Sequence, residues 1–159
     1  MTTFTLFHVF LSLVGILTGF VVLGAMIANK PVPGWTSAFV TTTLATVVTG
    51  FIFPVHRFMP SHAVGIVSLA ALLVAVLARY VFTLSGRWRR AYSVAAVIAL
   101  YLNVFVLVAQ SFQKIPALHE LAPSGTEAPF LLTQGGVLLL FIVLGIAAAK
   151  RFRGQILAL

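Results

Sequence analysis

Residues 4–28, FTLFHVFLSLVGILTGFVVLGAMIA, contain no Asp, Glu, Lys or Arg. A helix needs about 20 apolar residues to cross the ~30 Å hydrocarbon core of a bilayer. Lipid offers the backbone no hydrogen-bond partner, so a spanning segment with a continuous apolar run has to be helical. The run also follows no basic residue and is too long for the apolar region of a signal peptide. It therefore predicts a transmembrane helix that stays in the protein.

Four more apolar runs follow, and turn-forming or charged residues separate them. They cover residues 36–53, 63–84, 91–112 and 130–149. The whole chain of 159 residues is 61% hydrophobic and only 8% charged, whereas a soluble domain carries about 25% charged residues. We expect an all-α integral membrane bundle of five transmembrane helices, forming a single membrane domain over residues 1–159.

The basic residues predict an orientation. Five spans place the termini on opposite sides, and one side then holds Lys30, Arg87, Arg89, Arg90, Lys150, Arg151 and Arg153. The other side holds only Arg57 and Lys114, while Arg79 lies near the first side as an interfacial anchor or a buried pairing partner. Cytoplasmic segments are enriched in Lys and Arg. We therefore expect the N-terminus outside and the C-terminus in the cytoplasm. Basic residues at the cytoplasmic ends of the helices, near the surface of the lipid bilayer, then account for the net charge of +8. The charge does not indicate a nucleic-acid partner.

Small residues recur at helical spacing and predict close helix contacts. Gly15 and Gly19 form a GxxxG motif, and the pairs Ala71/Ala75, Ala95/Ala99 and Gly145/Ala149 repeat the spacing. In membranes such faces let helix backbones approach closely. They could pack within the chain, against other copies of it, or against other membrane subunits.

Polar side chains gather in the outer half of the predicted bundle. The candidate ligand-binding residues are His8, Asn103, Gln110, His62, His119 and Gln134. All four histidines, including His56, fall on the outer side. His8 and His62 each lie near the outer end of a span, which makes them the best pair for a metal ion or for haem b. Imidazole suits copper, zinc and haem iron. A quinone-like lipid near His62 and the glutamines is an equal alternative, and so is a set of interfacial side chains without a ligand.

Two further features bear on transport. Thr42, Thr46 and Thr49 share one helix face, where their hydroxyls could bond back to their own helix or line a cavity. Asn103 lies near the middle of its span, about 18 Å along the helix from Ala91. An amide at that depth bonds to a neighbouring helix or contacts a ligand.

The residue types of the chain do not favour a catalytic site. The chain has no Cys and no Asp, and its two acids, Glu120 and Glu127, belong to one loop. This excludes disulfides, thiolate metal sites and a Ser-His-Asp triad, and none of the common hydrolase or phosphate-binding motifs is present. We therefore expect a protein that is not an enzyme.

Three segments resemble small bacterial integral membrane proteins. They are GWTSAFVTTTLATVVTGFIFP (34–54), PSHAVGIVSLAALLVAVLARY (60–80) and ALYLNVFVLVAQSFQKIPAL (99–118). The resemblance implies a multi-pass protein of the bacterial inner membrane. It implies no activity, cofactor or catalytic residue.

These observations lead to one expected function and two alternatives. We expect a small binding or accessory subunit with a polar, histidine-containing site near the periplasmic face, holding haem, a metal ion or a quinone-like lipid. A small transporter or channel lined by the threonines and Asn103 is the first alternative. A purely structural membrane subunit without a ligand is the second.

Overall fold

The computed structural model describes residues 3–53 and 60–154, and all regular structure in these ranges is helical. Within them, five helices are long and apolar enough to cross a membrane, which confirms the predicted number of spans and indicates a multi-pass membrane protein. The elements are α1 (Thr3–Ala28), α2 (Pro33–Ile52), α3 (Pro60–Val76), the π-helical turn η1 (Leu77–Val81), α4 (Trp88–Lys114), α5 (Pro116–Leu121) and α6 (Ala128–Arg151). The short helix α5 was not predicted.

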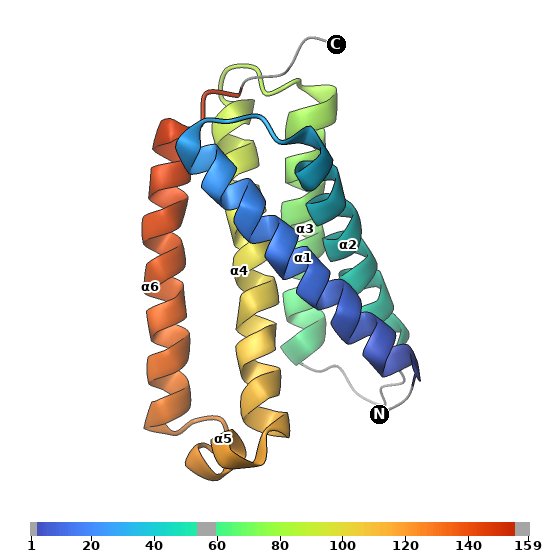
Figure 1. Cartoon of the computed structure of the whole chain (residues 1–159), viewed down its shortest axis with the longest axis vertical. Coiled ribbons are helices and arrows are strands. Elements are labelled where there is room, and N and C mark those ends of the chain that lie inside the picture. The colour runs from blue at the N-terminus through green and yellow to red at the C-terminus, as the bar shows by residue number, and fades with distance from the viewer. Residues whose placement is uncertain (1–2, 54–59, 155–159) are drawn as a thin grey trace.

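The long helices run along the length of the molecule, and α1 slants across the front of α4 (Figure 1). In an 18-residue apolar stretch of each helix, 50% of α4 is buried inside the bundle, but only 11% of α6. Helix α4 is therefore the centre of the bundle, and α6 is a peripheral helix with most of its surface open to lipid. The N-terminal end of α1 and the C-terminal end of α6 lie at opposite ends of the bundle (Figure 1).

Three of the four predicted small-residue faces pack inside the chain, and the fourth, Gly145/Ala149, is half-buried beside a groove between α4 and α6. Gly15 and Gly19 of α1 are both buried. A Cβ atom at Gly19 would lie only 2.5 Å from Leu100 Cδ1 and 2.9 Å from Phe39 Cε2. Glycine thus permits α1 to approach α2 and α4 this closely, as expected of small residues in membrane bundles. The four alanines of α3 and α4 in the predicted pairs belong to the same buried core.

Helix α3 ends differently from the prediction. Its apolar run continues to Leu84, but the helix widens into the η1 turn and stops at Val81. The N–H of Leu84 donates to the Ala78 carbonyl at 2.8 Å, and Thr83 and Leu84 adopt positive φ angles of 48° and 56°. The left-handed conformation is costly for residues with a Cβ. The burial of the Leu84 side chain, which is 5% exposed, helps to offset that cost.

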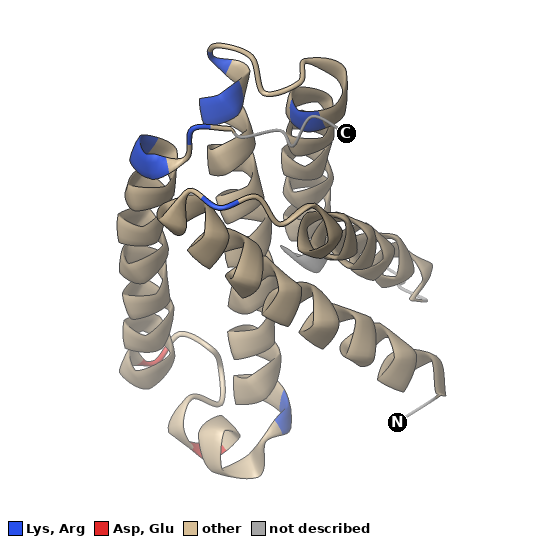
Figure 2. Ribbon diagram, turned by 45° about the horizontal axis from the view of Figure 1, so that its top comes forward, with Lys and Arg blue, Asp and Glu red and all other residues tan. Residues whose placement is uncertain are grey.

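Charge is separated between the two ends of the bundle. Figure 2 shows Lys and Arg gathered where α4 begins and α6 ends, with both acidic residues at the opposite end, where α4 ends at Lys114. The basic end carries the seven predicted residues together with Arg79, whose guanidinium lies 5.7 Å from the Tyr80 ring and 5.8 Å from the buried Tyr92 ring. Arg79 thus packs against aromatic rings at the end of its helix. Arg57 lies outside the described residues.

Three helix ends are joined at the basic end by hydrogen bonds of Asn29 and Arg89 to Arg153. Helix α1 ends in a Schellman motif, in which Lys30 N–H donates to the Ala25 carbonyl at 2.9 Å and Asn29 takes a φ of 53°. The Asn29 carboxamide oxygen then accepts a hydrogen bond from the Arg153 N–H at 2.8 Å. Arg89 Nη1 donates to the Arg153 carbonyl at 3.1 Å. These contacts fasten the end of α1, the start of α4 and the segment after α6 to one another.

Candidate functional site

A cavity of about 110 Å³ lies among α1, α2, α3 and α4, in the half of the bundle away from the basic end. Six polar side chains from all four helices line it, and the rest of its wall is apolar. The polar residues are His8, Ser12, Thr46, His62, Ser68 and Asn103. Three of the residues predicted from the sequence therefore share one cavity.

His8 is held in a defined orientation. Its Nδ1 lies 2.8 Å from the Thr49 hydroxyl oxygen. The Thr49 hydroxyl has one proton, and it donates this proton to the Ala45 carbonyl of its own helix at 2.7 Å. We therefore assign the proton of this contact to His8 Nδ1, which leaves the Nε2 lone pair of the neutral ring free of that bond. The ring also meets Phe53 edge to face at 5.2 Å.

His62 enters the cavity from the first turn of α3. Its half-buried ring lies 5.9 Å from the ring of Phe51 at the end of α2. One turn further, a Cβ at Gly65 would come within 2.8 Å of Phe51 Cζ. Gly65 thus makes room for the Phe51 ring, and that ring forms part of the cavity wall beside His62.

Asn103 closes the inner end of the cavity. Its side chain is 7% exposed, and Nδ2 donates to the hydroxyl of the fully buried Thr43 at 3.4 Å. A Cβ at Gly15 would lie 3.2 Å from Thr43 Oγ1 and 3.6 Å from Asn103 Nδ2. Asn103 therefore makes the predicted bond to a neighbouring helix and also lines the cavity.

The threonines on one face of α2 bond back to their own helix, and one of them also lines the cavity. Thr42, Thr46 and Thr49 each donate to the carbonyl four residues earlier, at 2.7–2.8 Å. Thr46 also lines the cavity. Further toward the basic end, the space between α1, α2 and α4 is packed by apolar side chains such as Phe39 and Leu100 and has no room for a water molecule. Among the described residues, the cavity ends at Asn103.

The other candidate residues lie elsewhere. Gln134 of α6 is buried and donates from Nε2 to the Phe105 carbonyl at 3.0 Å, so it fastens α6 to α4. Its Oε1 is buried without a hydrogen-bond partner. Gln110 is half-buried on α4 and His119 is exposed on α5, and neither lines the cavity. His56 lies outside the described residues.

Sequence reasoning missed Ser12 and Ser68 as cavity residues. A signal was present for one of them, because Ser12 follows His8 by four positions, whereas Ser68 follows His62 by six. The spacing of four places His8 and Ser12 on one helix face, whereas the spacing of six turns Ser68 about 120° away from His62, so that only Ser12 had a clear signal. The partnership of His8 with Thr49 had no signal, since the two residues are 41 positions apart.

The dimensions limit what the cavity can hold. Pockets for cofactors and drug-sized ligands usually measure about 300–1,000 Å³, so the cavity is too small for a haem group. Zinc sites use three or four protein ligands. Residues 3–53 and 60–154 contain no cluster of three His, Cys, Asp or Glu side chains that could hold a metal ion. The arrangement favours a small polar group.

The chain matches no family model, no curated protein and no solved structure.

Proposed function

We propose that the protein is a binding or accessory subunit of the bacterial inner membrane that holds the head group of a quinol-like lipid in the four-helix cavity. The observation that carries the proposal is the convergence of His8, His62, Asn103 and three hydroxyl side chains on one small cavity with an otherwise apolar wall. Few precisely placed polar groups in an apolar pocket are the usual composition of a ligand site.

The proton on His8 selects the kind of ligand. With Nδ1 donating to Thr49, the neutral ring offers an acceptor at Nε2. A phenolic hydroxyl of a quinol can donate to that acceptor, whereas a plain carbonyl cannot. The carboxamide of Asn103 and the hydroxyl of Ser68 are further polar partners on the same wall. An engineered cavity of about 150 Å³ can take up benzene, so this cavity of about 110 Å³ would hold only the hydroxyl-bearing edge of the ring, and the rest of the head group and its tail would extend toward the lipid.

A metal ion is the second candidate, because the bond from His8 to Thr49 has the form that orients metal-binding histidines. Such a ligand usually donates its other ring N–H to a neighbouring acceptor. His8 and His62 would then supply two ligands and water the rest. A channel is less well supported, since apolar side chains fill the space between α1, α2 and α4 on the side of Asn103 that faces the basic end.

Orientation belongs to the same proposal. The eight basic residues at one end, which are the seven predicted from the sequence together with Arg79, favour a cytoplasmic location for that end under the positive-inside rule. The N-terminus is then outside, the C-terminus is inside, and the cavity lies toward the periplasm.

Ligand binding is tested with the full chain in mild detergent. The probe is decylubiquinol, titrated in calorimetry, with zinc and copper salts in separate titrations. His8→Gln removes the acceptor arrangement, and His119→Gln is the matched control because His119 is exposed on α5. Losing one hydrogen bond of about 1 kcal/mol should weaken binding about fivefold. We expect that loss for His8→Gln and wild-type affinity for His119→Gln.

Three outcomes decide between the ligands. Binding of the quinol with the expected loss supports the proposal. Binding of a metal salt alone, lost in both His8→Gln and His62→Gln, replaces the quinol by a metal ion. Equal quinol affinity in His8→Gln and His119→Gln, or no binding of any probe, refutes a ligand in this cavity.

Orientation is tested by single cysteines, because the chain has none of its own. Ser124 lies between α5 and α6 and Ser85 between η1 and α4, and both are exposed at opposite ends of the bundle. In spheroplasts, a maleimide that cannot cross membranes should label Ser124→Cys at once and Ser85→Cys only after permeabilisation. The reverse pattern would overturn the orientation without affecting the ligand test.

A further inference from the structure

A second hollow lies on the opposite side of α4. It is a groove of about 290 Å³ between α4 and α6, with an almost entirely apolar lining. Val94, Ile98 and Tyr101 line it from α4, and Leu138, Ile142 and Ile146 line it from α6. Several of these side chains are more than 40% exposed, so the groove is open to the surroundings of the bundle. It has the shape and chemistry to take an acyl chain.

The groove ends at the basic end of the molecule. Helices α4 and α6 run in opposite directions, so the start of α4 lies beside the end of α6 (Figure 1). Arg90 precedes Val94 by one helical turn, and Lys150 follows Ile146 by one turn. Residues four apart lie on the same helix face. Both cations therefore continue the two walls of the groove beyond its apolar part.

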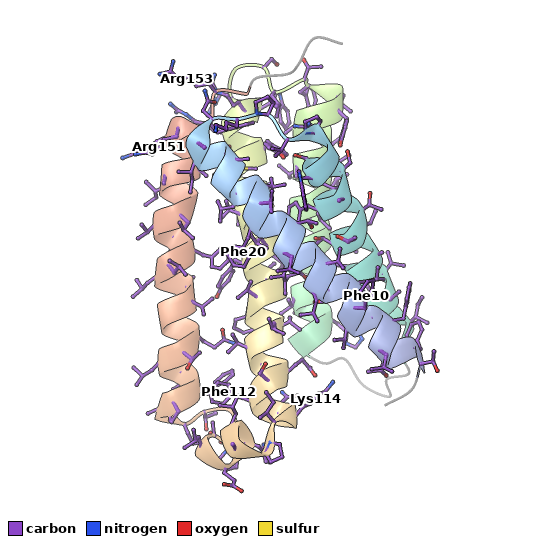
Figure 3. The ribbon with its side chains drawn as sticks, viewed as in Figure 1. Phe10, Phe20, Phe112, Lys114, Arg151 and Arg153 are labelled. Atoms are coloured by element: carbon purple, nitrogen blue, oxygen red, sulfur yellow. The ribbon has the colours of Figure 1, made fainter. Side chains whose placement is uncertain are left out.

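More positive charge surrounds this rim. Arg151 and Arg153 lie at the same end of α6, whereas Lys114 lies at the far end of α4 (Figure 3). Arg90 and Lys150 are both exposed. The only acidic side chains of the chain, Glu120 and Glu127, are at the opposite end of the bundle. The rim cations thus have no acidic side chain of this protein near them.

We propose that the groove between α4 and α6 is a site for an anionic phospholipid, with an acyl chain along the apolar walls and the phosphate between Arg90 and Lys150. Charge complementarity singles out this occupant. A zwitterionic lipid fits the apolar part equally well but brings no net charge to the rim. Basic pockets between transmembrane helices are the usual sites of anionic lipid head groups. The site is separate from the four-helix cavity and does not depend on its ligand.

Native mass spectrometry of the full chain in mild detergent tests the site. Dioleoyl phosphatidylglycerol and dioleoyl phosphatidylcholine are titrated separately, and the one-to-one complex is quantified. The double variant Arg90→Gln/Lys150→Gln removes both rim charges. Lys30→Gln/Lys114→Gln is the matched control, since it removes two charges that lie off the groove walls. Ala149→Phe keeps every charge but fills the groove beside Ile146.

We expect the wild type and the control pair to bind phosphatidylglycerol at least about fivefold more tightly than phosphatidylcholine, as one or two phosphate contacts imply. The rim variant should lose that preference, and Ala149→Phe should weaken binding of both lipids. Thermal unfolding of each variant verifies that it is folded. Equal affinities for the two lipids in the wild type overturn the proposal, and so does a preference that survives the rim variant. Unchanged binding in Ala149→Phe, or a dimer that excludes lipid, removes the groove as the site.

Discussion

Nδ1 of His8 lies 2.8 Å from the hydroxyl oxygen of Thr49 and joins the first helix to the second. Each partner is fixed on its other side. Thr49 bonds to the Ala45 carbonyl, and the His8 ring packs against Phe53. These contacts therefore favour one ring orientation and one tautomer for the histidine that faces the cavity.

Thr49→Val should remove the preference of His8 for that tautomer. Valine keeps the shape of threonine but offers His8 no acceptor, so the preference for a proton on Nδ1 disappears. Interhelical hydrogen bonds in membranes contribute about 0.6 kcal/mol on average, and we expect a loss of stability of that order. Nitrogen NMR of histidine-labelled protein reports the tautomer, and Thr49→Ser serves as the control that keeps the hydroxyl. An unchanged His8 spectrum in Thr49→Val would contradict the assignment of the proton.

Gly19→Ala should destabilise the bundle although alanine favours helices. The new methyl group would stand 2.5 Å from Leu100 Cδ1 and 2.9 Å from Phe39 Cε2. Overpacking of this kind costs about 1–3 kcal/mol. Gly24→Ala on the same helix is the control, because its methyl group meets no atom within 4 Å. Unfolding in increasing fractions of a denaturing detergent compares them, and equal stability of the two variants would argue against the close crossing of α1 over Phe39.

Asn29 should be replaceable by glycine at a lower cost than by alanine. Its φ of 53° lies in the left-handed region, which costs about 1–2 kcal/mol for an ordinary residue with a Cβ. Asn29→Gly loses only the bond from the Arg153 N–H, whereas Asn29→Ala loses that bond and adds strain. Thermal unfolding ranks the two variants. Hydrogen exchange at Arg153 should accelerate in both, and protection that persists would show that the bond to Asn29 contributes nothing.

Glu127 should titrate well below an ordinary glutamate. The hydroxyl of Ser124 donates to Oε1 at 2.8 Å and the Ser124 N–H at 3.0 Å, and the Thr126 N–H donates to Oε2 at 3.0 Å. These bonds, the Ser124 side chain first, lower the pKa of Glu127 from 4.5 to about 2. A lowered pKa means that this turn is stabilised fully above pH 4.5 and loses the stabilisation as the pH falls toward 2.

Carbon NMR of the Glu127 carboxyl group measures that pKa directly. Ser124→Ala removes the principal donor and should raise the pKa toward 4.5, while Ser111→Ala is the control because Ser111 donates to the Leu107 carbonyl and does not contact Glu127. A midpoint near 4.5 in the wild type would contradict the turn.

Much of the fold follows from local chemistry. The five spans could be predicted because each apolar run is long enough to cross a bilayer, and the packing of Gly15 and Gly19 follows a motif that is visible in the sequence. The end of α3 could not be predicted. Hydrophobicity continues to Leu84, and nothing in the side chains signals that the backbone leaves the helix at Val81.

The candidate site was predictable only in part. His8, His62 and Asn103 stand out as polar residues in apolar helices, and the structure brings them to one cavity. Gln134 stands out equally but binds the Phe105 carbonyl of a neighbouring helix. Polarity thus identifies residues that need a partner. Whether the partner is a helix or a ligand depends on how the helices cross, and a single sequence does not contain that information.

The separation of charge along the bundle has an electrical consequence. Moving one elementary charge across a membrane costs about 2.3 kcal/mol per 100 mV. Eight basic residues lie at one end of the bundle, and both glutamates lie at the other end with Lys114. Turning the molecule over in a membrane that carries a potential would move almost all of this charge from one side to the other. An energised membrane therefore favours the orientation in which the basic end faces the negative side by many times the thermal energy, independently of any contact that the helices make.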